Sequence, residues 1–231
     1  MDTLPITKID LNRIENTDSF PEHQPYPSSA SLALELGGVA IKFAQVERAP
    51  RYNEEHKEND AEHSFMLALV ANELAATYYP TFDAGKVTQF AIVHDLIETV
   101  TGDVTTFKFT PEQMANKQQL EHAALEKLMD SLPPHTAQLL YSYEHQQTVE
   151  ARFVKAVDKL LPVVVDILGA GKKVMKEDYG VTTIEELKAS HAKLHGRIAT
   201  SFEEFPLIVG AHKLLCHLFQ EEFEAATTRS R

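Results

Sequence analysis

The chain has 231 residues, 43% of them hydrophobic and 24% charged, which is the composition of a globular protein that can bury a sizeable core. Its formal net charge of −12 disfavours nucleic acid as a partner, because the protein as a whole repels a polyanion. Cys216 is the only cysteine, so an intrachain disulfide and a thiolate metal cluster are both excluded.

The first part of the chain, residues 1–30, is predicted to be an irregular leader that ends in a segment rich in proline and serine. It carries charges and prolines where a signal peptide has an apolar core. No stretch of the sequence approaches the roughly 18 consecutive apolar residues that a membrane-spanning helix needs. We therefore expect a cytoplasmic protein that does not associate with a membrane.

Helical spacing of apolar residues begins at Ser31, where we expect a first helix that Gly37 and Gly38 interrupt. A polar loop is predicted to follow it. Asp60 is a favourable N-cap for a second helix, which stops at Pro80. In the second helix the apolar positions recur every three or four residues, as they do on one face of a helix.

Three further helices are predicted in the middle of the chain, and prolines, glycines and polar segments set their ends. They cover residues 83–100, 111–132 and 135–145. The first of the three is the most apolar, which indicates a buried helix. Residues 148–171 follow as a long segment with one apolar face, in which Pro162 predicts a kink or a new helix start.

The C-terminal third begins with a turn rich in glycine and lysine and a polar segment up to Val181. Thr183 is then a favourable cap for a helix, and a last helix over residues 202–226 closes the chain. No long alternating strand pattern and no internal repeat is present in the sequence. We therefore predict an all-α helical bundle with a single domain over residues 31–225.

His94 and Asp95 stand side by side within the apolar sequence FAIVHDLI. Burying two ionisable groups is costly unless each has a partner, and a divalent cation is an efficient one, although such a pair alone is more often structural. Glu98 is predicted to share a helix face with Asp95, and a bound cation would relieve the repulsion between their carboxylates. The alternative is an acidic face in water, for which Leu96 and Ile97 leave little room.

His63 and Asp158 are two more polar residues inside apolar segments. Each alone is more simply interpreted as a core polar group with a satisfied hydrogen bond. Together with His94 and Asp95 they make a set of two imidazoles and two carboxylates on three predicted helices. That set suits one divalent transition metal (Mn, Fe, Co, Ni or Zn) better than calcium, but spacing alone does not show that the residues converge.

Histidines near the C-terminus give a weaker signal. His191 and His195 lie four residues apart on a predicted helix, but no acidic residue completes a metal site and we expect them on a solvated face. His212, Cys216 and His217 are interpreted as a chance cluster, because the sequence supplies no identifiable partner for the thiol.

Four short motifs occur in a fixed order, and together they resemble a known family. They are RAPR from Arg48, NDAEH up to His63, HDLIETVTGD from His94 and EARFVKAVDKL up to Leu160. A lone His-Asp pair is uninformative, whereas HDxxE followed by Gly-Asp, with an upstream Glu-His and a downstream Asp, is specific. The chain resembles the HD-domain phosphohydrolase superfamily, and within it the 5′-deoxynucleotidase (YfbR-like) group, from about Arg48 to Leu161.

The resemblance implies a metal centre with four ligands. They are His63, His94, Asp95 and Asp158. Glu98 falls where the family has a carboxylate that turnover requires. His63, Asp95 and Asp158 are also expected to border the bound substrate.

The resemblance also implies a substrate-binding region. Asp103 falls where the family contacts the nucleoside sugar and orients the attacking water, together with the three residues that follow it, Val104, Thr105 and Thr106. Arg48 falls where an arginine holds the substrate phosphate. The neighbouring Ala49 replaces a tryptophan found in some members, a departure that bears on base and sugar selection.

The function that the resemblance implies is hydrolysis of (deoxy)nucleoside 5′-monophosphates by a metal-activated water, with Glu98 or Asp103 as general base. A homodimer is also implied, and the apolar segment Leu160–Leu168 is interpreted as core or as a dimer face. A nucleoside triphosphate triphosphohydrolase on the same scaffold is the alternative enzyme. Four lysines could bind the extra phosphates: Lys155, Lys159, Lys172 and Lys173. A nucleotide-binding module that has lost the chemistry is the alternative from another class.

Overall fold

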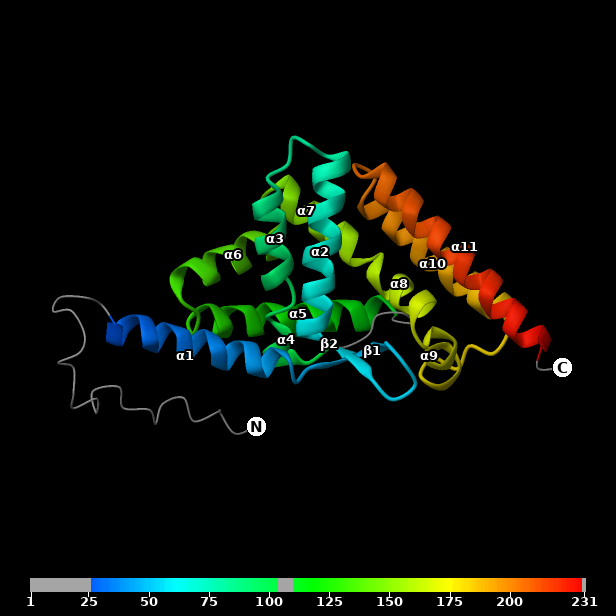
Figure 1. Cartoon of the computed structure of the whole chain (residues 1–231), viewed down its shortest axis with the longest axis horizontal. Helices are drawn as coiled ribbons and strands as arrows, with labels where there is room; N and C mark the ends of the chain where they lie inside the picture. The colour runs from blue at the N-terminus through cyan, green and yellow to red at the C-terminus, as the bar shows by residue number, and fades with distance from the viewer. Residues whose placement is uncertain (1–25, 104–109, 230–231) are drawn as a thin grey trace.

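The computed structural model describes residues 26–103 and 110–229, in which helices dominate and the only sheet is a two-stranded hairpin (Figure 1). The elements follow in chain order as α1 (Tyr26–Phe43), β1 (Glu47–Arg51), β2 (Lys57–Asn59), α2 (Asp60–Tyr78), α3 (Ala84–Val93), α4 (Glu98–Thr101), α5 (Pro111–Met129), α6 (Pro134–Glu144), α7 (Val149–Asp158), α8 (Leu161–Leu168), α9 (Gly171–Glu177), α10 (Ile184–Ser201) and α11 (Pro206–Arg229). The predicted all-α class is confirmed.

Helix α1 begins earlier than the sequence pattern suggests. It starts at Tyr26 and runs without a break to Phe43, so the predicted leader is wrong for residues 26–30 and the predicted interruption at Gly37 is wrong as well. A glycine inside a helix lowers its stability by about 1 kcal/mol relative to alanine but does not end it. The rest of the predicted leader, residues 1–25, lies outside the described part of the chain.

The segment between α1 and α2, predicted to be a polar loop, is an antiparallel hairpin. Strands β1 and β2 pair Glu47 with Asn59 and Arg51 with Lys57, with an irregular register between the two pairs. The prediction failed because the strands consist mostly of charged and polar residues and show no alternation of apolar and polar positions.

Helix α2 begins one residue away from its predicted cap. The N-cap is Asn59, whose side chain accepts a hydrogen bond from the backbone N–H of Glu62, while the Glu62 side chain accepts one from the backbone N–H of Asn59. Asp60, predicted as the cap, is the first helical residue, and its side chain is fully buried. The change of role matters because the Asp60 carboxylate points into the protein.

The single helix predicted for residues 83–100 is two helices. Helix α3 ends at Val93, a turn carries His94 and Asp95, and α4 begins at Glu98. Backbone hydrogen bonds between residues three apart form this turn. Leu96 N–H donates to the Val93 carbonyl at 3.1 Å, and Glu98 N–H donates to the Asp95 carbonyl at 2.8 Å. The break therefore falls on the two residues of the His-Asp motif, where helix periodicity gave no sign of it.

The predicted restart at Pro162 is confirmed, because α7 ends at Asp158 and α8 begins at Leu161 with the proline in its first turn. The turn predicted after α8 contains the short helix α9 instead. Most of Leu160–Leu168 is core, with Leu161 fully buried, while Leu168 at its end is 80% exposed.

Three hydrophobic clusters hold the described residues together. The first joins α2, α3 and α7 around large side chains such as Leu67, Phe90 and Phe153. The second packs α5 and α6 against the end of α3. The third joins α8 and α9 to the antiparallel pair α10 and α11, which form one side of the molecule in Figure 1. None of the described helices is both long and apolar enough to cross a membrane.

Candidate metal centre

The four predicted ligands come from three parts of the fold and converge. His63 Nε2 lies 2.8 Å from Asp158 Oδ1, His94 Nε2 lies 2.9 Å from Asp95 Oδ2, and His94 Nε2 lies 3.9 Å from Asp158 Oδ1. His63 is on α2, the His94–Asp95 pair is in the turn between α3 and α4, and Asp158 is the last residue of α7. His63, His94 and Asp158 offer ligand atoms within 4.8 Å of one another, whereas Asp95 contacts this group through His94 and belongs to a second group with Asp60 and Glu98. The spatial condition for a shared ion is therefore met by the first three residues, and the assignment of all four as ligands stays a prediction.

The hydrogen bonds of His94 identify which ring nitrogen faces the centre. Its Nδ1 lies 2.9 Å from the carbonyl oxygen of Ala91, which accepts only, so Nδ1 carries the proton. In the neutral ring, Nε2 then presents a lone pair toward Asp95 Oδ2. Nε2 is buried and has no well-oriented hydrogen-bond partner among the described residues. A cation between imidazole nitrogen and carboxylate fits this arrangement, and the Ala91 carbonyl fixes the tautomer.

His63 is fully buried between two carboxylates. Its Nε2 contacts Asp158, and its Nδ1 lies 3.3 Å from Glu58 Oε2. Burial and the positive charge of Arg48 oppose protonation of the ring, but the hydrogen bonds to Asp158 and Glu58 outweigh them and raise the pKa of His63 to about 9. A metal ion would have to displace the proton on Nε2, so binding depends on pH.

Arg48 from β1 lies at the centre of a group of carboxylates rather than in an exposed loop. Its NH1 group donates to Asp95 Oδ2 at 2.8 Å and to Asp60 Oδ1 at 3.1 Å, and lies 3.8 Å from Glu98 Oε2. Its Nε donates to Glu58 Oε2 at 3.2 Å. These charge-assisted bonds hold the guanidinium in one position and offset the repulsion among the carboxylates.

Sequence patterns missed Glu58 and Asp60, whose side chains are fully buried at the centre. Glu58 contacts both Arg48 and His63, and it also accepts a hydrogen bond from the Tyr52 hydroxyl. Both residues belong to the charged sequence KEND, which resembles a solvated loop. Glu58 belongs to the short strand β2 and Asp60 begins helix α2, so no single periodicity relates the two side chains and no sequence pattern indicated their burial.

Glu98 and Asp103 lie near the metal centre, and their roles toward a substrate stay predictions. Both line the pocket at the metal centre, and an oxygen of Glu98 belongs with oxygens of Asp60 and Asp95 to a group within 4.8 Å of one another. Burial, followed by the charges of Asp95 and Asp103, raises the pKa of Glu98 to about 10. Residues 104–106, predicted to contact the substrate, lie outside the described part of the chain.

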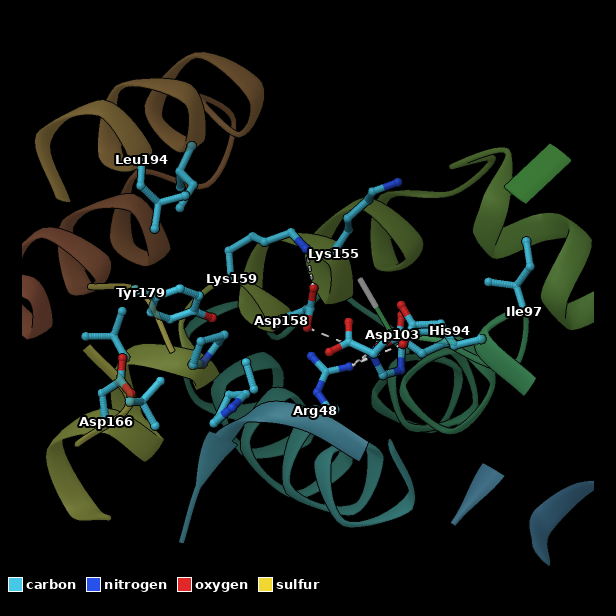
Figure 2. Close-up of a pocket in the computed structure, with 18 of the residues that line it drawn as sticks. Arg48, His94, Ile97, Asp103, Lys155, Asp158, Lys159, Asp166, Tyr179 and Leu194 are labelled. Carbon is cyan, nitrogen blue, oxygen red and sulfur yellow. Dashed lines mark hydrogen bonds and ion pairs between the residues drawn. The ribbon is translucent and has the colours of Figure 1, made fainter. Parts of the chain in front are cut away.

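Lys159 also forms an ion pair at the centre, with Nζ 2.6 Å from Asp158 Oδ2 (Figure 2). Burial opposes ionisation of Asp158, but Lys159 and His63 outweigh it and hold the pKa of this carboxyl well below its usual range. Asp158 thus presents Oδ1 to the histidines and Oδ2 to the lysine. A negatively charged oxygen is therefore available on the metal side.

A pocket of about 390 Å³ opens beside the centre. Its charged end includes Arg48, Ala49, Asp103 and Lys155, and its other end is mainly apolar and reaches α10. Figure 2 shows Arg48 and His94 at one end and Tyr179 and Leu194 toward the other. One end of the pocket could thus bind a charged group and the other a less polar part of the same molecule.

The C-terminal histidines are placed differently from their prediction. Of the two histidines predicted on a solvated face, His191 is buried and His195 is half-buried. His212 is buried as well and stacks on His195 with ring centroids 5.5 Å apart. Cys216 Sγ lies 3.7 Å from His212 Nε2. The prediction failed because the polar face of α10 packs against α11 instead of facing water. Among the described residues, the groups spaced to hold an ion all lie at the centre formed by α2, α3–α4 and α7.

A comparison with solved structures finds a protein of similar fold. A solved structure titled as a predicted metal-dependent phosphohydrolase from Magnetospirillum magnetotacticum matches with a TM-score of 0.64 and 24% identity, covering 85% of this chain and 95% of that one. At this identity the likeness concerns the fold alone.

Curated relatives give the same family. The 5′-deoxynucleotidase HDDC2 of Xenopus laevis is 31% identical over 145 residues, which are 57% of this chain and 70% of that protein. The 5′-deoxynucleotidase of Enterobacter sp. (strain 638) is 33% identical over 124 residues, and the chain spans only 62% of its length. The model of the HD domain family matches residues 41–201, more than half of the sequence. The chain belongs to the HD domain family.

Proposed function

We propose that this HD-domain protein is a metal-dependent phosphohydrolase that releases phosphate from 2′-deoxynucleoside 5′-monophosphates. The observation that carries the proposal is the convergence of His63, His94, Asp95 and Asp158 beside a pocket that also contains an arginine. The relatives named 5′-deoxynucleotidase support the substrate class. Two further carboxylates, Glu58 and Asp60, accept hydrogen bonds from this arginine.

The proposed cofactor is one divalent transition metal held by the four converging side chains. The lone pair of His94 Nε2 and the oxygens of Asp95 and Asp158 make a mixed nitrogen and oxygen donor set that Mn, Fe, Co, Ni and Zn accept. Such an ion, when bound, lowers the pKa of a water molecule and neutralises phosphate charge. The Ala91 carbonyl and Glu58 orient the two imidazoles toward it.

Arg48 is proposed to bind the substrate phosphate. Its guanidinium lines the pocket and lies against Asp95, next to the proposed metal position. A guanidinium can donate two parallel hydrogen bonds to phosphate oxygens, and it keeps its charge at every relevant pH. Glu58 accepts a hydrogen bond from Arg48 Nε and Asp60 accepts one from its NH1 group, so the arginine is oriented before the substrate arrives.

Glu98 is proposed to accept the proton of the attacking water, with Asp103 placing that water and the sugar. Both carboxylates border the pocket within the α3–α4 region that also carries Asp95. Without a metal ion, burial and the neighbouring carboxylates favour the protonated form of Glu98. The positive charge of a bound divalent ion would lower this pKa and leave the carboxylate able to accept the proton of the water.

Domain extent, assembly and location stay proposals. We propose a catalytic unit over residues 31–225, with α1 extending it to Tyr26. We also propose a cytoplasmic homodimer, as the resemblance to the family implies. Exposed apolar side chains on α2, Phe65 at 73% and Leu69 at 64%, are candidates for the contact between two copies. Light scattering on the purified full chain would measure the molar mass directly.

A triphosphohydrolase has less support from the lysines than the sequence suggested. Lys155 and Lys159 line the pocket, and Lys159 is paired with Asp158. Lys172 lies 3.6 Å from Glu222 and Lys173 donates to the Glu54 carbonyl, so both have partners on other elements. Product analysis separates the two reactions, because one releases orthophosphate and the other releases tripolyphosphate.

The proposed function is tested with the full chain loaded separately with Mn, Fe, Co, Ni or Zn. Release of orthophosphate and of tripolyphosphate is measured on a panel of deoxynucleoside monophosphates, ribonucleoside monophosphates and deoxynucleoside triphosphates. We expect the deoxynucleoside monophosphates to give the highest kcat/KM with at least one metal. Release of tripolyphosphate, or no turnover with any loaded metal, would contradict the proposal.

A further inference from the structure

The apolar end of the pocket lies away from the proposed metal position. Val163 of α8, Met175 of α9, Tyr179, and Leu194 and Ile198 of α10 line it. These side chains come from the elements of the third hydrophobic cluster or lie against it. An aromatic ring system can bury its faces among such side chains.

A single carboxylate, Asp166, is embedded in this apolar end. The residue lines the pocket and is only 8% exposed. Within residues 26–103 and 110–229, its carboxylate has no hydrogen bond and no ion pair. Burial, with a smaller contribution from Glu58, raises the pKa of Asp166 to about 7. A buried carboxylate of this kind is stabilised when a ligand donates hydrogen bonds to it.

Neighbouring groups fix Asp166 in place without neutralising it. A Cβ at Gly171 would lie 2.4 Å from the Asp166 backbone, so α9 packs directly onto this residue. His191 lines the same end, but burial lowers its pKa to about 4 and keeps its ring neutral. Its Nδ1 accepts a hydrogen bond from the Gln220 amide at 3.0 Å. The carboxylate therefore faces the pocket with no positively charged imidazole beside it.

The two ends of the pocket lie on consecutive helices. Asp158 ends α7 at the metal centre, Asp166 lies within α8, and both residues line the same pocket. A nucleoside monophosphate whose phosphate contacts Arg48 would extend its base along the pocket toward Asp166. Figure 2 shows Asp166 and Tyr179 on the side of the pocket away from His94.

We propose that Asp166 binds the base of a guanine nucleotide, with its two oxygens accepting hydrogen bonds from the guanine N1–H and the exocyclic 2-amino group. This inference rests on the proposed function, because it places the phosphate of the same substrate at the metal centre. Guanine offers two adjacent donors, which match the two oxygens of an ionised carboxylate. Adenine offers one donor beside an acceptor, and thymine one donor between two carbonyls, so each leaves an unfavourable contact.

The test uses Asp166→Asn in the full metal-loaded chain. The amide replaces one acceptor with a donor, which suits the donor–acceptor edge of adenine and not the two donors of guanine. Dissociation constants are measured for 2′-deoxyguanosine and 2′-deoxyadenosine, and kcat/KM for dGMP and dAMP, at a pH above the pKa of Asp166. Glu177→Gln is the matched control, because Glu177 is an exposed residue of the adjacent helix α9.

We expect the wild type and Glu177→Gln to prefer guanine by about tenfold or more in both measurements, and Asp166→Asn to lose or reverse that preference. Hydrolysis of 2-deoxyribose 5-phosphate, which lacks a base, should be the same in all three proteins. An unchanged ratio of dGMP to dAMP in Asp166→Asn overturns the base site and leaves the proposed function intact. Equal loss on every substrate, including the sugar phosphate, also overturns it, since Asp166 would then be structural.

The nucleoside measurements separate this inference from the proposed function. If deoxyguanosine binds selectively through Asp166 while no monophosphate is hydrolysed, the base site stands and the proposed reaction fails. If monophosphates are hydrolysed while deoxyguanosine and deoxyadenosine bind the wild type equally, the reaction stands and the base site fails.

Discussion

At the residue scale, the metal centre concentrates negative charge around one arginine. Arg48 contacts carboxylates from β2, from α2 and from the turn after α3, and Asp158 lies at the end of α7 close to both histidines. Like charges at this separation destabilise one another unless cations lie among them. Arg48 and Lys159 supply two positive charges, and a divalent ion beside His94 would supply two more.

His94 is predicted to be essential for metal binding. Replacing His94 by Ala removes the nitrogen whose lone pair faces Asp95, so we expect loss of bound metal and at least about a hundredfold loss of activity. Metal content by mass spectrometry and phosphate release on deoxynucleoside monophosphates provide the measurement. Asp95→Asn, which keeps the side-chain volume, should give the same result. Full activity in either variant would show that the ligand assignment is wrong.

Glu98 is predicted to act on turnover and not on metal retention. Glu98→Gln keeps the shape of the side chain but removes its ability to accept a proton, so kcat should fall by about 10² to 10⁴. Metal content should equal that of the wild type, in contrast to the His94 variant. Unchanged kcat would eliminate the general-base role.

Glu58 is predicted to increase metal affinity indirectly, because its carboxylate contacts the ring nitrogen of His63 that does not face the metal position. Glu58→Gln weakens its contacts with His63 Nδ1 and Arg48 Nε, and we expect metal affinity to fall by about 10- to 100-fold. Competition with a chelator measures the affinity. Glu54→Gln is the matched control in the same hairpin, since the Glu54 side chain is 84% exposed. Equal affinities in the two variants would refute the orienting role.

The sequence pattern identified the candidate metal ligands but not the two buried carboxylates that contact Arg48 beside them. His63, His94 and Asp158 could be identified because each interrupts an apolar segment, where an ionisable group needs a partner. Glu58 and Asp60 lie in a charged sequence that gives no such contrast. Their burial depends on Arg48, which the hairpin brings in from β1, and that is a contact between separate segments.

At the scale of elements, long helices were predictable and short irregular ones were not. Helices α5, α6 and α10 begin close to the predicted residues, since prolines or a threonine cap define their starts. The break between α3 and α4 contains neither glycine nor proline, and its apolar residues fit a continuous helix. Tertiary contacts of the His-Asp turn decide the conformation there, and helix propensity is a weak guide in such cases.

Gly169 is predicted to be indispensable for the contact between the end of α8 and β1. A Cβ at this position would lie 2.2 Å from the Arg51 carbonyl oxygen and 2.9 Å from that of Val165. Because both obstacles are backbone atoms, Gly169→Ala should lower the free energy of unfolding by at least about 2 kcal/mol. Urea unfolding of the full chain measures the change.

Gly196→Ala is the matched control for that prediction. Gly196 lies within α10, and a Cβ there would meet no atom within 4 Å. Alanine should therefore raise the free energy of unfolding by about 0.5–1 kcal/mol, because it restricts the unfolded chain and favours the helix. A stable Gly169→Ala protein would show that the β1–α8 contact adjusts without loss.

At the scale of the whole molecule, buried neutral histidines link stability to pH. Burial lowers the pKa of His191 and of His212 from 6.5 to about 4. Between these two pH values the unfolded chain binds more protons than the folded protein, so stability rises with pH across this window. The free energy of unfolding therefore has its full value, as far as these two histidines are concerned, above about pH 6.5, and it declines as the pH falls toward 4.

His191→Gln should therefore weaken the dependence of stability on pH. Glutamine does not titrate, so the fall in Tm between pH 7 and pH 5 should be about 1 °C or more smaller than in the wild type. Thermal unfolding monitored by circular dichroism at the two pH values gives the comparison. The metal centre titrates in both proteins, so its effect cancels when the fall in Tm of the variant is subtracted from that of the wild type. Equal falls in Tm would contradict a neutral His191.

The pocket crosses the boundary between two separately packed parts of the molecule. The proposed ligands lie on elements of the first hydrophobic cluster, whereas the wall around Asp166 belongs to the third. If the proposed roles hold, the residues for the reaction and those for base recognition lie in regions with different constraints on their sequences. Substitutions in α9 and α10 can reshape which molecules are accepted while the residues that perform the reaction stay untouched, so new selectivity can evolve on this scaffold without passing through an inactive intermediate.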